Sequence, residues 1–248
     1  MARNKRSLIF VLAGLLAGFL AAGSSMHGLA AHKPAPAKPS NKAAAVPAIA
    51  IKPELIREAA GRGELRYLKP ALAAGADPNA ADADGTTALM RAAEAGHASA
   101  IGVLLAAGAD VSRANVRGET ALTLAVRARK VEALASLLAG GGLSIPRGLA
   151  KDAALTCAPD VIALLAKAGV KIDAVDGDGA TPLMAAAKRC GGGAIKELAA
   201  ANPKVDVADR LGRTALWHAA NSANAEAVSA LILAGAGADA ADAEGITP

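Results

Sequence analysis

Side chains that could act as nucleophiles, general bases or metal ligands are sparse in this chain of 248 residues. It has two cysteines and four histidines, and two of those histidines, His27 and His32, lie near the N-terminus. No H-x-x-x-H, C-x-x-C or G-x-S-x-G pattern occurs, so the spacings typical of zinc sites and nucleophile elbows are missing. The stretch from Asp176 to Asp178 is too short for a calcium loop. The sequence therefore predicts no enzyme, no metal site and no cofactor.

The charge of the chain is concentrated at its N-terminal end. Lys and Arg number 27 against 22 Asp and Glu, but seven of these bases precede Glu54, which is the first acid. From residue 53 onward, 20 bases face 22 acids. The remainder of the chain therefore has no basic excess, and the sequence predicts no nucleic-acid partner.

The first residues have the three-part layout of a secretory signal peptide. Three basic residues precede an apolar run over residues 8–22, and small residues follow it. We expect residues 1–31 to be the signal peptide, with cleavage after Gly23, Ala30 or Ala31. The alternative is a retained membrane anchor, but the apolar run is shorter than the ~20 residues that a span prefers. The sequence therefore predicts export, with no membrane span after cleavage.

Residues 32–52 have the composition of a disordered linker. They carry four prolines and four lysines among Ala and Ser, and such a segment stays extended and buries little surface. The lysines could contact an anionic membrane or a cell-wall polymer, but a solvated tether is the simpler interpretation. The folded part of the chain is therefore expected to begin at residue 53.

A period of 33 residues organises the rest of the sequence. Gly85, Gly118, Gly179, Gly212 and Gly245 are each followed two residues later by Thr, at spacings of 33, 61, 33 and 33. A second glycine series shows that one internal repeat has lost five residues. A fixed period of this length is typical of a solenoid, in which each unit buries its apolar face only against its neighbours.

One unit, residues 82–114, predicts a tight turn followed by two helices. Gly85 permits the turn, Thr87 can cap the first helix, and Gly96 ends it. A second apolar stripe then runs to Gly108. Aromatic residues make up only 2% of the chain, so its interior must be filled by Leu, Ile, Val and Ala. Small side chains of this kind suit closely stacked helices.

This unit resembles the ankyrin repeat. The motifs are D-A-D-G-T-T-A-L-M-R-A-A-E-A-G-H from Asp82, L-L-A-A-G-A-D-V from Leu104 and D-G-D-G-A-T-P-L-M-A-A-A from Asp176. The resemblance implies an all-α solenoid of about six repeats, with hairpin tips on one side, inner helices along a concave face and outer helices behind. The expected units are 53–81, 82–114, 115–147, 148–175, 176–208 and 209–241, with a partial unit at 242–248.

The departures from the family pattern are informative. The 148–175 unit lacks the turn motif, so we expect a kink there, and Pro70 falls inside an outer helix. Arg129 and Ala223 replace the glycine between the helices. The family's His after T-P-L is replaced by Met90, Thr123, Met184 and Trp217. The chain stops at Pro248 inside a repeat motif, so we expect either that the natural chain continues or that this end docks on a partner.

The resemblance implies a protein-binding scaffold whose partner contacts hairpin tips and inner-helix ends. The candidate residues are Arg62, Asp84, Glu94, Arg117, Glu119, Arg127, Arg147, Lys188, Arg189, Arg210, Arg213 and Trp217. With Asp178 and Glu244 included, eight bases face five acids at such positions, so an acidic partner segment is one hypothesis and a solvated face is the other. Trp217 could pack against a neighbouring unit or bind the partner.

Cys157 and Cys190 are 33 residues apart, which is one full period. They should therefore stack at equivalent places, near the ends of the inner helices of two units. Packed helix axes lie ~8–10 Å apart, whereas a disulfide needs Cα atoms within roughly 6.8 Å. The shortened unit and the glycines at 191–193 could close that gap. A disulfide and two separate buried thiols both stay open.

The leader and linker indicate where the protein works. A signal peptide followed by a short tether suits the periplasm of a bacterium. A secreted effector and an adaptor anchored in the inner membrane are the alternatives.

Overall fold

The computed structural model describes residues 52–140, 144–201 and 204–248. The predicted signal peptide, 1–31, and nearly all of the linker, 32–52, lie outside these ranges. Twelve α-helices and two isolated β-bridges make up the regular structure of the described part, which confirms the all-α prediction. No helix in it has both the length and the apolar character needed to cross a bilayer.

The helices come in pairs, and each predicted unit from 53–81 to 209–241 holds one pair. The pairs are α1 (Pro53–Arg62) and α2 (Leu65–Ala73), α3 (Ala88–Ala95) and α4 (Ala98–Ala106), α5 (Ala121–Arg127) and α6 (Val131–Ala139), α7 (Leu149–Thr156) and α8 (Pro159–Lys167), α9 (Pro182–Ala187) and α10 (Gly192–Ala201), and α11 (Ala215–Asn221) and α12 (Ala225–Leu233). As predicted, Pro70 lies inside α2.

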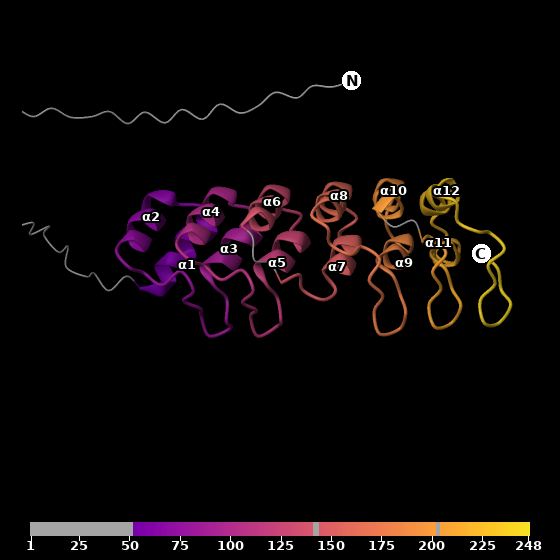
Figure 1. Cartoon of the computed structure of the whole chain (residues 1–248), viewed down its shortest axis with the longest axis horizontal. Coiled ribbons are helices and arrows are strands. Elements are labelled where there is room, and N and C mark those ends of the chain that lie inside the picture. Colours follow the sequence, from indigo (N-terminus) through magenta and orange to yellow (C-terminus); the bar gives the residue numbers. More distant parts are fainter. Residues whose placement is uncertain (1–51, 141–143, 202–203) are drawn as a thin grey trace, which may run out of the picture. The chain divides into compact units, whose positions relative to one another are not determined.

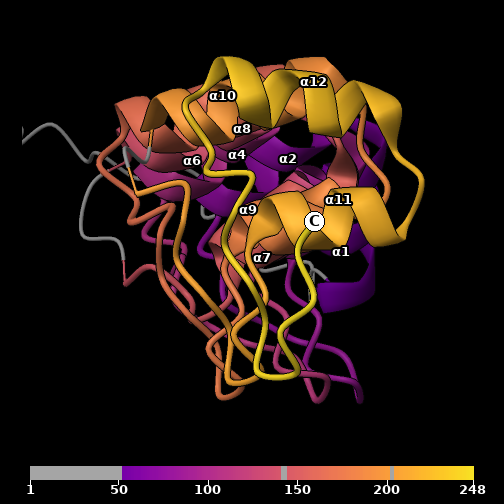
Figure 2. The ribbon, with the colours of Figure 1, turned by 90° about the vertical axis from the view of Figure 1, so that its right-hand side faces the viewer.

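Two parallel rows of helices run along the described repeats. Each odd-numbered helix packs on the next odd-numbered helix, and each even-numbered helix packs on the next even-numbered one. Hairpin loops project beyond the odd-numbered row, on the side away from the even-numbered row (Figures 1 and 2). We therefore call the odd-numbered helices inner and the even-numbered helices outer.

A threonine caps four of the inner helices, α3, α5, α9 and α11, and so stabilises their first turns. The Thr87 hydroxyl accepts from the backbone N of Met90 at 3.3 Å, and Thr120, Thr181 and Thr214 cap α5, α9 and α11 in the same way. Such a cap contributes about 1 kcal/mol. Alanine pairs such as Ala92 and Ala93 are fully buried, so neighbouring helices can approach closely. The many alanines thus form a closely packed aliphatic core together with Leu, Ile and Val.

Each hairpin is built on one Asp or Asn. In the first hairpin, Oδ1 of Asp82 accepts from the backbone N of Asp84 at 3.1 Å and of Thr86 at 2.8 Å. The same pair of hydrogen bonds recurs at Asn115, Asp176, Asp209 and Asp242. A side chain that binds its own turn in this way replaces part of a backbone ladder. The glycine at the fourth position supplies the positive φ that closes the turn.

The fourth unit departs from this pattern, as its missing motif predicts. Residues 144–148 lead directly into α7 without a hairpin, and the N-cap of α7 is Gly148, which offers no side-chain hydrogen bond. The loop before α7 is visibly shorter than its neighbours in Figure 1. The five missing residues therefore come from the hairpin, while both helices of the unit are retained.

The turn between inner and outer helices keeps a left-handed residue in three units that have lost the glycine. Arg129, Cys157 and Ala223 have φ of 54°, 55° and 52°, Gly63 and Gly96 take this place in the first two units, and no described residue of the fifth-unit turn has a positive φ. An L-residue in this conformation costs roughly 1–2 kcal/mol. The repeat geometry is therefore imposed at these positions against local preference.

Candidate functional site

The candidate residues lie along the surface formed by the hairpins and the adjoining sides of the inner helices, which we call the hairpin face. Asp84, Arg117 and Arg210 lie at hairpin tips, and the two arginine side chains are 73% and 72% exposed. Glu119 and Arg213 follow the tips and are more buried.

A second group lies where the inner helices end. These exposed residues are Arg62, Glu94, Arg127, Lys188 and Arg189, on or just after α1, α3, α5 and α9. Arg147 lies apart from both groups, in the loop that leads into α7. The predicted residues thus mark two lines along the repeats, one at the hairpin tips and one at the helix ends.

Glu119 organises the middle of the hairpin face. Its carboxylate accepts from Nε of Arg117 at 2.8 Å and from Nη1 of Arg127 at 2.6 Å. Hydrogen bonds from Asn115 and from Arg117 lower the pKa of Glu119 despite its burial. Arg127 also reaches Asp152 of the next unit at 3.6 Å. Three of the predicted residues therefore form one network, which continues across a repeat boundary.

Asp209 holds a second network, on the sixth unit. Its buried Oδ2 accepts from Nε of Arg213 at 3.0 Å and from Nε2 of His218 at 3.1 Å. Burial alone would raise the pKa of Asp209, but hydrogen bonds from Arg213, Leu211 and His218 lower it to about 2. Burial lowers the pKa of His218, against the hydrogen bond to Asp209. Asp209 is therefore an ionised acceptor that fixes the side chains around it.

Trp217 is half-buried and joins this second network. The Arg213 guanidinium lies 5.2 Å from the centre of the Trp217 ring, and the His218 ring packs edge-on at 5.3 Å. A cation over an indole ring is favourable. Trp217 thus packs within its own unit and still presents part of its ring to solvent.

Sequence reasoning missed Lys151 and Asp176 but included Arg210 and Asp178, and both pairs join neighbouring units. Lys151 contacts Asp176 at 2.6 Å, from the fourth unit to the fifth, and Arg210 contacts Asp178 at 3.3 Å, from the sixth to the fifth. Asp176 belongs to the Asp/Asn series three residues before each turn glycine. That periodic signal was present in the sequence and would have identified both Asp176 and Asp209.

The structure corrects the predicted basic excess of this face. Carboxylates not counted in the prediction lie among the counted bases, namely Glu58, Asp82, Asp152, Asp176 and Asp209. Further cations also lie there, namely Arg57, Arg91 and Lys151. The predicted excess counted only hairpin tips and inner-helix ends, whereas these carboxylates lie at the starts of hairpins or within helices. The hairpin face is therefore a nearly balanced pattern of both signs.

Histidine and acidic side chains have structural roles here. Nε2 of His97 lies 3.1 Å from the carbonyl oxygen of Gly61 in the preceding unit, which links two interhelix turns. Within the described ranges, no group of three or more His, Cys, Asp or Glu residues is placed to hold a metal ion.

Cys157 and Cys190 form a disulfide, with their Cα atoms 5.1 Å apart. It joins the interhelix turns of the fourth and fifth units, at the end of the inner helices opposite the hairpins. The spacing of one period does bring the two residues together. Cys157, whose backbone is left-handed, lies in the interhelix turn of the fourth unit.

Sequence comparison settles the family. The profile of ankyrin repeats (three copies) matches residues 56–145 and 151–243, which is well over half of the chain. The chain belongs to the ankyrin repeat family. A comparison with curated proteins finds no match.

Solved ankyrin repeat domains are similar over most of the described part. The ankyrin repeat domain of human ASB11 is 26% identical, with a TM-score of 0.69 over 77% of this chain and 88% of that one. An ankyrin repeat domain from Acinetobacter baumannii AYE is 27% identical, with a TM-score of 0.65 over 74% and 98%. One chain of the complex between the Bd0816 predatory endopeptidase of Bdellovibrio bacteriovorus and the immunity protein Bd3460 is 28% identical, with a TM-score of 0.61 over 72% and 96%.

Ankyrin repeats generally bind other proteins and generally carry no catalytic groups. In the described part of this chain, many polar side chains form helix caps, hairpin turns and ion pairs. What the arrangement can do is present a long, ordered surface of charged side chains.

Proposed function

We propose that this protein is a non-catalytic binding scaffold of the bacterial envelope, which holds a partner protein on its hairpin face. The observation that carries this is the ordered row of exposed arginines and carboxylates across five units. Arg117 and Arg210 project at the tips while Glu119 and Asp209 fix their surroundings. Arginine is enriched among residues that dominate binding energy. The likeness to a chain of a bacterial protein–protein complex supports the proposal.

The proposed compartment is the periplasm. Its support is the signal-peptide pattern at 1–31 and the disulfide between Cys157 and Cys190. Disulfides persist in oxidising compartments and are rare in the cytosol. N-terminal sequencing of the mature chain tests this proposal. A start at residue 24, 31 or 32 is expected, whereas an intact leader indicates a membrane-tethered adaptor and recovery from the medium indicates a secreted effector.

Partner capture from envelope extract tests the binding face. The exposed double variant Arg117→Glu and Arg210→Glu changes two hairpin tips. The control, Lys69→Glu and Lys196→Glu, reverses two charges on the outer helices α2 and α10. We expect mass spectrometry to show a protein captured by the wild type and the control, and lost or strongly reduced with the tip variant. Equal capture by all three would contradict the proposed face.

Ionic strength gives a second test of the same face. Exposed charges are screened within ~10 Å at 0.1 M salt. Capture should therefore weaken as salt is raised, and binding that ignores salt would exclude a charged contact.

A further inference from the structure

The hairpins of neighbouring units are joined by backbone hydrogen bonds at their tips. The backbone N of Val116 donates to the carbonyl of Asp84 at 2.9 Å. In the same register, the backbone N of Arg210 donates to the carbonyl of Asp178 at 3.1 Å, and the backbone N of Ala243 donates to the carbonyl of Leu211 at 2.9 Å. One backbone hydrogen bond thus joins each of these hairpins to the next at the tip.

This row is interrupted at the fourth unit. By the repeat register, the carbonyl of Arg117 and the N–H of Gly177 are the groups that a fourth hairpin would bind, and neither has a partner among the described residues. A Cβ added to Gly85 or Gly212 would meet the next hairpin at 3.2 or 3.0 Å, whereas one added to Gly118 meets nothing within 4 Å. No described residue therefore covers the hairpin edge on either side of the fourth unit.

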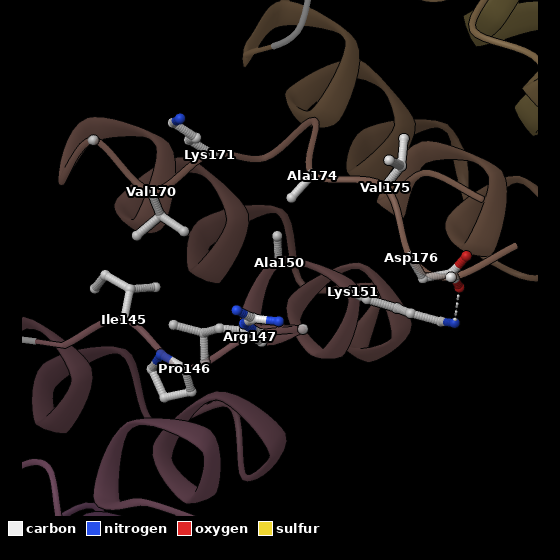
Figure 3. A pocket seen from close by; sticks show the side chains of 14 residues that line it. Ile145, Pro146, Arg147, Ala150, Lys151, Val170, Lys171, Ala174, Val175 and Asp176 are labelled. Carbon is white, nitrogen blue, oxygen red and sulfur yellow. Dashed lines mark hydrogen bonds and ion pairs between the residues drawn. The ribbon is translucent and has the colours of Figure 1, made fainter. Parts of the chain in front are cut away.

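A cavity of about 830 Å³ lies on the fifth-unit side of this interruption. We call it the notch, and its walls are residues 145–151 and the segments 169–171 and 174–177. Figure 3 shows the stretch from Ile145 to Arg147 on one side and that from Ala174 to Asp176 on the other. Ile145 is 40% exposed and Val175 is 56% exposed. Two branched apolar side chains thus remain exposed at the edge of the notch.

The free charges of the notch are both positive. Lys151 is paired with Asp176, whose carboxylate also accepts from the backbone of its own turn. The side chains of Arg147 and Lys171 line the notch and form no ion pair within the described ranges. A carboxylate is the complementary group.

We propose that the notch binds an extended segment of the partner protein, about as long as the five residues missing from the fourth unit. The segment carries a carboxylate for Arg147 or Lys171, one branched apolar side chain that packs on Ile145 and another that packs on Val175. Its backbone accepts a hydrogen bond from the N–H of Gly177, as a strand added to a sheet edge does. This inference rests on the proposed scaffold function and locates one part of the partner.

Synthetic peptides and NMR of the full, ¹⁵N-labelled chain test the notch directly. The probe is the acetylated peptide Ser-Glu-Ile-Glu-Val-Glu-Ser-Gly, titrated into the millimolar range, with a second peptide in which Lys replaces every Glu. We expect the Glu peptide to shift the Gly177 amide and the Lys peptide to leave it unchanged. The amides of Arg210 and Ala243 are internal controls, because a neighbouring hairpin already binds them. An unmoved Gly177, or equal shifts at all three amides, would overturn the proposal.

Variants separate the notch from the rest of the hairpin face. Reversal of Arg147 and Lys171 to Glu should weaken Glu-peptide binding about threefold to tenfold, as expected for two partly exposed pairs. The matched control is Lys69→Glu with Lys196→Glu on the outer helices, which should bind as the wild type does. Ala174→Trp fills the notch from an exposed position and should abolish the Gly177 shift.

The experiments distinguish a failure of the notch proposal from a failure of the scaffold proposal. If the tip variant of Arg117 and Arg210 loses the envelope partner while the Glu peptide leaves Gly177 unmoved, the notch proposal is wrong and the scaffold proposal stands. If the peptide binds at the notch while the tip variant retains the partner, the notch proposal stands and the tips are not the binding site.

Discussion

The junction between the fifth and sixth units and the junctions around the fourth unit are held together differently. Between the fifth and sixth units, the backbone N of Arg210 donates to the carbonyl of Asp178. At the interhelix end of the same junction, Nδ2 of Asn224 donates to the carbonyls of Ala187 at 3.0 Å and Cys190 at 2.9 Å. Around the fourth unit the hairpin bonds are absent from the described residues, and side-chain ion pairs and the disulfide of Cys157 take their place.

This difference shows that a solenoid can lose a contact at one end of its inner helices and keep its stacking through the other end. Each unit contacts only its neighbours, so stability is a sum of units and junctions. A unit that lacks its hairpin is a weak junction unless another interaction replaces it. The disulfide joins the fourth unit to the fifth through their interhelix turns. On the hairpin side, no described residue replaces the lost contact.

Removing the disulfide should have the largest effect. Closing a loop of 33 residues stabilises a chain by about 3–4 kcal/mol in the chain-entropy account. We therefore expect Cys157→Ser with Cys190→Ser to lower the free energy of unfolding by about that amount, measured by urea denaturation. Reducing agent should destabilise the wild type and leave the double variant unchanged. Two free thiols per unreduced, denatured chain from the periplasm would show that no disulfide forms.

Asp209 should account for the next largest effect, in the regular part of the stack. Its pKa is about 2 in the folded chain against an ordinary value of 3.8, so ionisation stabilises the fold by about 2 kcal/mol. Because the folded pKa is the lower one, this stabilisation is complete above about pH 4 and is lost as the pH falls toward 2. Asp209→Asn should remove that part of the acid sensitivity, and an unchanged pH profile of the urea midpoint would contradict the assignment.

Asn224→Ala tests the interhelix side of the regular junction. The change removes two hydrogen bonds to the preceding unit and the cap on the backbone N of Ala227. We expect a loss of about 1–2 kcal/mol. Asn79→Ala is a comparison variant, because Asn79 also joins successive loops but caps no helix. A smaller loss is expected for it, and equal losses would show that the cap contributes nothing.

Two glycine-to-alanine variants should differ least in their loss of stability, and that difference reports only on contact with the next hairpin. Gly118 and Gly212 have φ of +73° and +76°, so alanine costs the same backbone strain at both. At Gly212 the new Cβ would also lie 3.0 Å from the backbone N of Ala243, whereas at Gly118 it meets nothing. Gly212→Ala should therefore be more destabilising by about 1 kcal/mol. Equal losses would mean that the side of Gly118 is not open.

Much of the fold could be predicted from sequence because it depends on local, periodic signals. The recurrent Gly85 and Thr87 pattern locates turns and caps, and the 33-residue spacing locates units and the cysteine pair. The missing motif before Leu149 marks the unit whose inner helix has no hairpin before it, and the kink expected there stays a prediction. These features depend on backbone conformation and on residues close in the chain.

The candidate site was less predictable, because some of its contacts join different units. The pairs of Arg127 with Asp152 and of Lys151 with Asp176 depend on how far one unit is rotated on the next, which no single motif specifies. The open edge at Gly177 follows from an absent neighbour and leaves no signal in that residue itself. Counting only the charges at tips and helix ends therefore overestimated the basic character of the hairpin face.

Hydrogen exchange at the hairpin tips tests the central claim most directly, namely that the row of hairpins is interrupted at the fourth unit. Exchange is slowed where a backbone N–H is held in a hydrogen bond. In the oxidised full chain, the amides of Val116, Arg210 and Ala243 should exchange about tenfold or more slowly than that of Gly177, after correction for intrinsic rates. Protection of Gly177 equal to that of the other three would show that its edge is occupied and would contradict the account.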